Sequence, residues 1–156
     1  MDRRKINEYY AEIGQDLIET EPSLNSVKES DVIITYLSSS QKKMSCGQPV
    51  LGQCEKIADK YKWGIPCDFT VTIFEPNIIM LDDDQIRALI HHELLHVGID
   101  TDEDEREKYF IRPHDMVDFR LILEKYGVDW NLPKTEDNSP SLFDFVKDLE
   151  NVSEIH

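Results

Sequence analysis

The segment from Asp82 to Gly98, DDDQIRALIHHELLHVG, restricts the fold of this chain more than any other part of the sequence. Three aspartates open it, providing an N-cap and negative charge at the positive end of a helix dipole. Apolar side chains then recur at helical spacing: Ile86, Leu89, Ile90, Leu94 and Val97. Gly98 is typical of a helix end. The pattern predicts an amphipathic helix over about residues 83–97 that packs one face against a core.

The same predicted helix contains the pattern H-E-x-x-H, formed by His92, Glu93 and His96. Four residues correspond to about 400° of helix rotation, so the two histidines lie one above the other and can bind one metal ion. Glu93 lies about 100° further around the helix, where its carboxylate can take a proton from a metal-activated water. We therefore predict a zinc site with these two histidines as ligands and Glu93 as the catalytic base. The alternative is a helix whose polar face happens to carry histidines.

A catalytic zinc ion also needs a third protein ligand and an open coordination position. The longer pattern H-E-x-x-H-x-x-G-x-x-H is absent, because Gly98 follows His96 by two residues and no histidine stands at the required offset. His114, which opens the next expected helix, is the favoured third ligand, and a helix-capping role is its alternative. His91 points about 100° away from His92 and is interpreted as a surface residue or an outer-sphere residue of the site.

Further candidate site residues surround His114. Asp115 can cap its own helix or accept a hydrogen bond from a ligand histidine, since metal-bound histidines usually need such a partner. Asp118, three residues further on, is a second candidate for this role. A group that stabilises the oxyanion is expected as well. Proximity to the third ligand leaves three candidates for that role: Tyr109, Arg112 and Tyr126. A purely structural role is the alternative for all three, because half-buried aromatic residues and arginines are common.

The rest of the sequence predicts a single mixed α and β domain. Periodic apolar residues predict a helix over 3–19, and β-branched and aromatic residues predict strands over 31–37 and 67–75. Residues 50–63 fit a strand in their first half and a helical turn in their second. A chain of 156 residues suffices for one domain, assigned to residues 1–130 with a core over about 30–130. Residues 131–156 are predicted to form a linker and a short amphipathic helix.

Charge and cysteine content limit the partners and the compartment. Seventeen basic and 32 acidic residues give a net charge of −15, which disfavours binding to nucleic acid. The acidic connector over residues 100–107 lacks the glycine and glutamate of a calcium loop and is interpreted as a solvated lid over the site. The sequence has no signal peptide and no apolar run long enough for a membrane span, so a cytoplasmic protein is expected. Three cysteines without a C-x-x-C pair are expected as free thiols.

Two segments, QIRALIHHELLHVGID and RPHDMVDFRLILEKYG, resemble the phage metallopeptidases, a group of small zincin-like domains found in phages and prophages. The preceding segment GQPVLGQCEKIADKYKWGIPCDFTVTIFEPN resembles their central strand region, so the resemblance covers about residues 30–130. It implies zinc bound by His92, His96 and His114, with Glu93 as general base. It also implies a compact α+β zincin-like core, similar in outline to SprT-like and minimal gluzincin folds. In that core a small sheet packs on the H-E-x-x-H helix and on a following helix that carries the third ligand.

The leading hypothesis is therefore a zinc-dependent metallopeptidase that hydrolyses peptide bonds in a protein or peptide substrate. The alternative is a zincin-fold binding protein with little or no catalysis, whose acidic surface contacts a basic host partner. A metal-dependent hydrolase acting on nucleic acid is disfavoured by the charge of −15.

Overall fold

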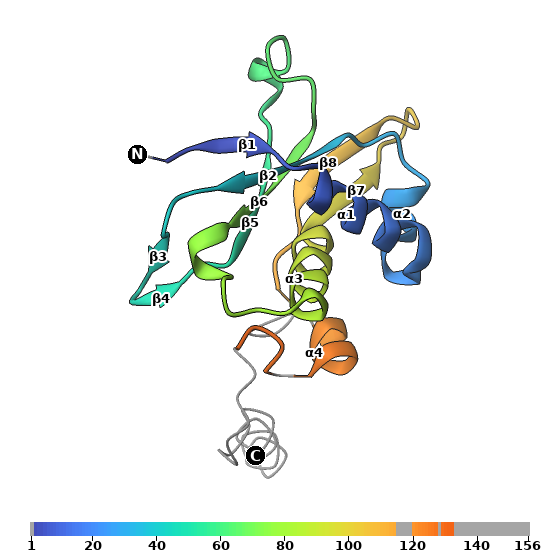
Figure 1. The fold of residues 1–156 in the computed structure, drawn as a ribbon. Coiled ribbons are helices and arrows are strands. Elements are labelled where there is room, and N and C mark those ends of the chain that lie inside the picture. Colours follow the sequence, from blue (N-terminus) through green and yellow to red (C-terminus); the bar gives the residue numbers. More distant parts are fainter. Residues whose placement is uncertain (1, 115–119, 128, 133–156) are drawn as a thin grey trace.

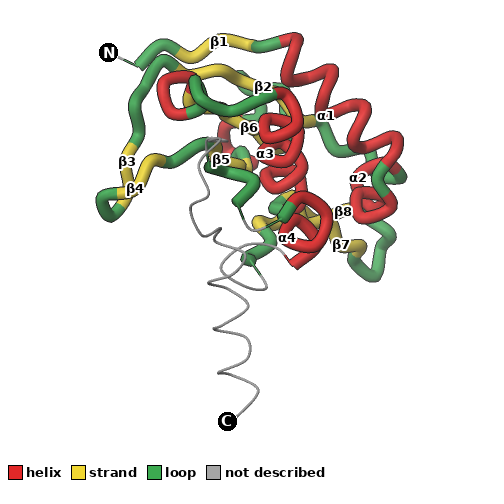
Figure 2. The backbone as a smooth tube through the Cα atoms, turned by 60° about the horizontal axis from the view of Figure 1, so that its bottom comes forward, coloured by secondary structure: helices red, strands yellow, loops and turns green. Residues whose placement is uncertain are grey.

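The computed structural model of the chain describes residues 2–114, 120–127 and 129–132. It is a mixed α and β structure in which helices cover one face of a small sheet (Figures 1 and 2). The α-helices are α1 (Glu8–Thr20), α2 (Asn25–Lys28), α3 (Asp83–Leu95) and α4 (Arg120–Tyr126). Short 3-10 turns are η1 (Pro22–Leu24), η2 (Asp59–Tyr61) and η3 (Glu75–Asn77).

The main sheet has the strand order β1-β2-β6-β5, formed by Arg4–Ile6, Ile34–Ser39, Phe69–Phe74 and Gly52–Lys56. Strands β2 and β6 are parallel, whereas β1 and β5 run antiparallel to their neighbours. The inner strand β6 is buried along almost its whole length, which explains its run of β-branched and aromatic residues. Strand β5 forms the edge of the sheet on the side of α3.

Helices α1 and α3 pack against each other and against the sheet. Helix α1 contacts β2, and α3 contacts β5 and β6. The side chains between them form one apolar core whose most deeply buried members include Leu17, Phe69, Ile73, Leu89 and Leu94. The apolar side chains expected on the central helix thus face this core. Their packing fixes the direction in which the polar face of α3 points.

Two hairpins complete the described structure. Strands β3 (Met44–Ser45) and β4 (Gln48–Pro49) enclose Cys46 and Gly47, whose φ angles of 51° and 77° suit a tight hairpin turn. Strands β7 (Val97–Thr101) and β8 (Glu107–Ile111) form the second hairpin. The segment predicted as an acidic connector is therefore a regular hairpin with an acidic tip.

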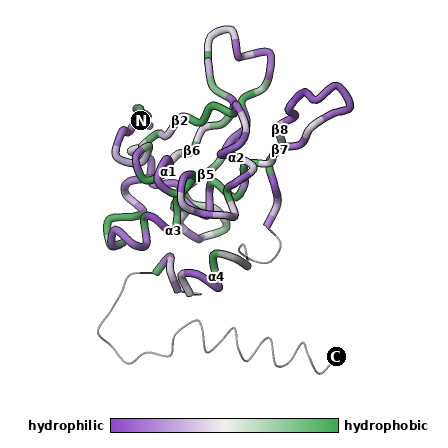
Figure 3. The backbone as a smooth tube through the Cα atoms, turned by 90° about the vertical axis from the view of Figure 1, so that its right-hand side faces the viewer, coloured by the Kyte–Doolittle hydropathy of each residue, from purple (hydrophilic) through white to green (hydrophobic). Residues whose placement is uncertain are grey.

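The prediction that this acidic segment covers the site is wrong. Val97 pairs with Ile111 next to the end of α3, while Thr101 pairs with Glu107 at the far end of the hairpin. The two pairs are four residue steps apart along the strand, about 14 Å at 3.4 Å per residue. The hydrophilic tip projects away from the body of the domain (Figure 3).

Several boundaries also differ from the predictions. The predicted helix over 3–19 divides into β1 and α1, because the Asn7 side chain accepts from the Tyr10 amide at 3.0 Å and begins the helix there. The predicted strands appear at 34–39 and 69–74, and the ambiguous stretch 50–63 forms β5 followed by η2. Gly98 does not end a helix but lies within β7, where a side chain would meet the ring of Phe110.

The helix that was expected to begin at His114 is described only in its later part, α4, which ends at Tyr126. Gly127 follows with a φ of 90°, as expected after a helix C-terminus. Asp115 and Asp118 lie outside the described residues, as do residues 133–156 with their predicted terminal helix. Among the helices that the structure describes, none is long and apolar enough to cross a membrane. Cys46, Cys54 and Cys67 are free thiols.

Candidate metal centre

Helix α3 begins with a capping box and ends at the two histidines. The Asp82 carboxylate accepts from the Gln85 amide at 2.9 Å, and the Gln85 side chain accepts from the Asp82 amide at 3.0 Å. The helix ends at Leu95, so His92 lies in the last turn and His96 is the C-cap residue. Both imidazoles are half-buried and their ring centroids are 5.1 Å apart. The predicted stacking on one helix face is present.

His114 joins this pair. The imidazole nitrogens that His92, His96 and His114 offer all lie within 4.8 Å of one another. Nε2 of His92 is 3.1 Å from Nε2 of His114. Two nitrogens bound to one zinc ion at tetrahedral angles are about 3.3 Å apart, because each Zn–N bond measures 2.0–2.1 Å. One pair of nitrogens therefore already has the spacing of two ligands on one tetrahedral ion, and the third lies within 4.8 Å of both.

The β7–β8 hairpin explains how His114, 18 positions after His96, returns to the end of α3. Its register returns the chain to the helix end, where the Arg112 amide donates to the His96 carbonyl at 2.7 Å. Nδ1 of His96 lies 2.7 Å from the Arg112 carbonyl oxygen. This contact places the proton on Nδ1 and leaves Nε2 of His96 available for a metal ion.

Glu93 is nearly buried and lines a cleft that also contacts His92. Its side chain is 5 % exposed, and its Oε1 is 3.9 Å from Nε2 of His92. The cleft has a volume of about 200 Å³ and is lined by Leu51, Gly52, Leu89, His92, Glu93, Trp130 and Asn131. A Cβ atom at Gly52 would lie 3.3 Å from Cγ of Glu93 and 3.2 Å from the Thr72 carbonyl oxygen, so the glycine allows strand β5 to approach this carboxylate closely.

His91 is not a surface residue, contrary to the first of its two interpretations. Its side chain is fully buried, with Nε2 3.0 Å from the Ser23 hydroxyl and Nδ1 3.0 Å from the Tyr126 hydroxyl. Burial, and then the positive charge of Arg87, lowers its pKa to about 4. The neutral ring therefore links η1, α3 and α4 through its two nitrogens.

The three candidates for stabilising an oxyanion have different surroundings. The Tyr126 hydroxyl is engaged by His91, and the Tyr109 hydroxyl donates to Glu107 at 3.1 Å. Arg112 is half-buried, and its backbone amide and carbonyl oxygen both contact His96. The structure therefore brings the backbone of Arg112, but neither tyrosine hydroxyl, to the three histidines.

Two residues of the site were not predicted. Trp130 is 7 % exposed and its ring lies 5.7 Å from that of His92, tilted by 35°. Gly52 supports Glu93 from strand β5. The only sequence signal for Trp130 is that a large apolar residue stands next to an expected linker. The only signal for Gly52 is that a glycine stands inside an expected strand. Neither signal points to a metal site.

A mixed α and β domain with three histidines gathered at the end of one helix belongs to the class of candidate metal-binding domains. The sequence model of the family described as "Putative phage metallopeptidase" matches residues 3–137, and the chain belongs to this family. The matched range includes the three histidines and also α1, which lies outside the segments that carried the resemblance. Comparisons with curated proteins and with solved structures give no match. A metallopeptidase family implies a bound metal ion and protein or peptide substrates.

Proposed function

We propose that this protein is a zinc-dependent peptidase with a zincin-like core, in which His92, His96 and His114 bind the metal and Glu93 is the general base. The observation that carries the proposal is the approach of three imidazole nitrogens to within 4.8 Å of one another beside a buried glutamate. The arrangement of an edge strand, β5, alongside the helix that bears H-E-x-x-H supports the zincin-like assignment.

The donor set favours zinc over harder cations. Imidazole nitrogens suit zinc, whereas calcium and magnesium prefer oxygen ligands. Three protein ligands leave one position of a tetrahedral ion open, as a catalytic site requires. When bound, zinc would supply a Lewis acid that makes water nucleophilic near neutral pH and polarises a carbonyl group.

Glu93 would carry the proton during hydrolysis. Its carboxylate takes a proton from the attacking water and then donates it to the amine that leaves. Its Oε1 lies 3.9 Å from the His92 nitrogen, outside the group of three imidazoles, which supports a role as a base rather than as a ligand. Its low exposure keeps bulk water away, and Gly52 allows the wall of the cleft to close against the side chain.

Metal analysis of purified variants tests the site. Wild-type protein should contain about one equivalent of zinc, and alanine at His92, His96 or His114 should reduce that content strongly. His91→Gln is the matched control, because His91 is adjacent in sequence but bonded to Ser23 and Tyr126. Zinc content that is unchanged in all three alanine variants would refute the ligand assignment.

Cleavage of a mixture of peptides, followed by mass spectrometry, tests the activity. Glu93→Gln should retain zinc and lose about 10²- to 10⁴-fold in cleavage rate, the usual contribution of a general base. A Glu93→Gln variant that cleaves as fast as the wild type would refute the role of this carboxylate.

The acidic hairpin tip supports a second candidate function, binding of a basic protein. Residues 100 and 103–105 are exposed acidic side chains at the projecting end of β7–β8, in a chain of net charge −15. Glu103→Gln with Asp104→Asn should weaken capture of a basic partner and leave peptide cleavage unchanged. If the Glu93→Gln variant had the same biological effect as the wild-type protein, a binding function would be favoured over a peptidase function.

A further inference from the structure

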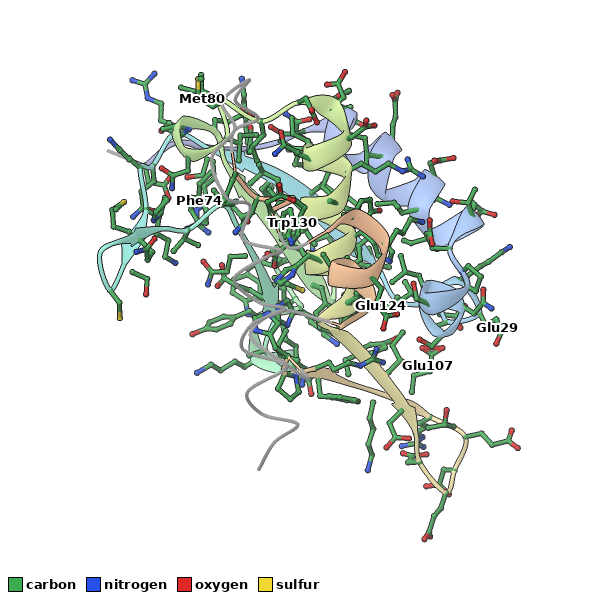
Figure 4. The ribbon with its side chains drawn as sticks, turned by 90° about the horizontal axis from the view of Figure 1, so that it is seen from below. Glu29, Phe74, Met80, Glu107, Glu124 and Trp130 are labelled. Carbon is green, nitrogen blue, oxygen red and sulfur yellow. The ribbon has the colours of Figure 1, made fainter. Side chains whose placement is uncertain are left out.

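Three exposed apolar residues lie around the start of α3, and we call them the terminal patch. Ile79 and Met80, in the loop between η3 and α3, are 78 % and 71 % exposed, and Leu132, the last residue that the structure describes, is 40 % exposed. Figure 4 shows Met80 at the periphery of the molecule. Among the large apolar side chains that the structure describes, only Trp63 is more exposed than Ile79 and Met80. Neighbouring apolar residues with this exposure indicate a surface that another segment covers.

A hydrogen bond fixes the place where the chain continues beyond the described structure. The buried Gln85 side chain accepts from the Asp82 amide in the capping box of α3, and its amide nitrogen donates to the carbonyl oxygen of Leu132. Asp82 follows Met80 by two residues. Leu132 is therefore held at the first turn of α3, and the chain after it starts at the terminal patch.

The sequence after Leu132 contains a spacer and an apolar segment. Residues 133–141, PKTEDNSPS, contain two prolines and no aliphatic or aromatic side chain other than these, which is typical of a linker. Residues 142–152, the terminal segment, lie outside the described residues and beyond the range 3–137 of the family match. Their apolar residues recur at the spacing of one helix face: Leu142, Phe145, Val146, Leu149 and Val152.

The length of the spacer favours contact within one molecule. The nine residues 133–141 have a root-mean-square span of about 15–18 Å as a flexible linker, and a helix of the eleven residues 142–152 is about 16 Å long. A short linker also gives an effective concentration on the order of millimolar. A second copy of the chain at micromolar concentration therefore competes poorly for the terminal patch.

We propose that the terminal segment forms an amphipathic helix that packs its apolar face on the terminal patch of the same molecule. The apolar residues on both sides then leave water together, while the charged residues of the segment remain in solvent. Such packing would hold the turn at residues 129–132 from a second side, and Trp130 and Asn131 of that turn line the cleft beside Glu93. The contact requires neither a metal ion nor peptidase activity.

Site-specific photo-crosslinking of the full chain tests the contact directly. The photoreactive residue p-benzoylphenylalanine replaces Met80, the protein is irradiated at micromolar concentration, and the products are identified by mass spectrometry. Cross-links from position 80 to residues 142–152 should appear within monomers. The matched control carries the same residue at Trp63, which is also exposed but precedes β6, whereas Met80 follows β6. Position 63 should give no cross-link to the terminal segment.

Substitutions in the terminal segment test the apolar face. Phe145→Ser with Leu149→Ser should reduce the cross-link yield about tenfold or more, because two large apolar side chains lose their burial. Asp148→Ser, on the expected polar face, should leave the yield unchanged. Hydrogen exchange of the amides of residues 78–81 gives a second measurement without a photoreactive residue, and it should be about tenfold slower in the wild type than in the double variant.

Several results would overturn the proposal. These are no cross-link from position 80 to residues 142–152, cross-links that join two copies of the chain, equal yields from positions 63 and 80, or a yield and exchange rate that the double variant does not change. Zinc content and peptide cleavage are measured separately, so failure of the proposed peptidase function is distinguished from failure of this contact.

Discussion

The buried His91 should make the free energy of unfolding of this protein depend on pH across the mildly acidic range. Burial holds its pKa at about 4 in the folded protein, compared with 6.5 for an unperturbed histidine. Below pH 6.5 the unfolded chain therefore binds a proton that the folded chain does not bind. Stability is fully present above pH 6.5, decreases as the pH falls, and levels off below pH 4.

The magnitude follows from the difference in pKa. Each pKa unit corresponds to 1.36 kcal/mol, so a difference of about 2.5 units between 6.5 and 4 lowers the free energy of unfolding by about 3 kcal/mol. A change of this size is a large share of the 5–15 kcal/mol that typically stabilises a domain. His91 is fully buried, so solvent screening does not reduce the effect much.

Urea unfolding of wild-type and His91→Gln protein between pH 7 and pH 4, with EDTA present in both series, measures this contribution. Glutamine keeps a donor and an acceptor for the partners of His91 but does not titrate in this range. Other titrating groups contribute equally to both proteins, so the wild type should lose about 3 kcal/mol more than the variant. Parallel pH profiles for the two proteins would refute the reasoning.

Three further predictions concern glycines and the helix cap. Gly14→Ala should lower the free energy of unfolding, measured by chemical denaturation, by about 1–3 kcal/mol. The added Cβ would lie 2.3 Å from the buried ring of Tyr36, and this overpacking exceeds the gain in helix propensity. Increased stability of the variant would contradict this prediction. Gly52→Ala should displace Glu93 and reduce peptide cleavage about tenfold or more while zinc content stays constant, and undiminished cleavage would show that the close approach is unimportant. Asp82→Ala should remove the capping box and lower thermal stability by about 1 kcal/mol, whereas an unchanged melting temperature would exclude that role.

The strongly patterned parts of the sequence were predicted well. The helix that bears His92 and Glu93 begins at the expected residue, because an aspartate cap followed by periodic apolar residues is a local signal. Strand β6 was also predicted, since its β-branched and aromatic residues suit a buried strand. The mixed α and β class follows from local patterns of the same kind.

The weakly patterned parts were predicted poorly. The three-residue strand β1 is too short for a periodic signal and is defined by its pairing with β2. The β7–β8 hairpin was interpreted as a solvated lid because its tip is acidic, although Asp102 stabilises the turn by accepting from the Arg106 amide at 2.8 Å. His91 was interpreted from its angle on the helix, which cannot reveal that η1 and α4 enclose it.

The sequence by itself determined the pair of histidines and the adjacent glutamate, because helix geometry alone sets the relative directions of residues one and four positions apart. Only the tertiary structure decided how the site is completed. The register of a hairpin brings His114 to the pair, a backbone carbonyl orients His96, and Trp130 from beyond α4 forms a wall of the cleft. These contacts join residues far apart in the chain, and they depend on the packing of whole elements, which no local sequence pattern specifies.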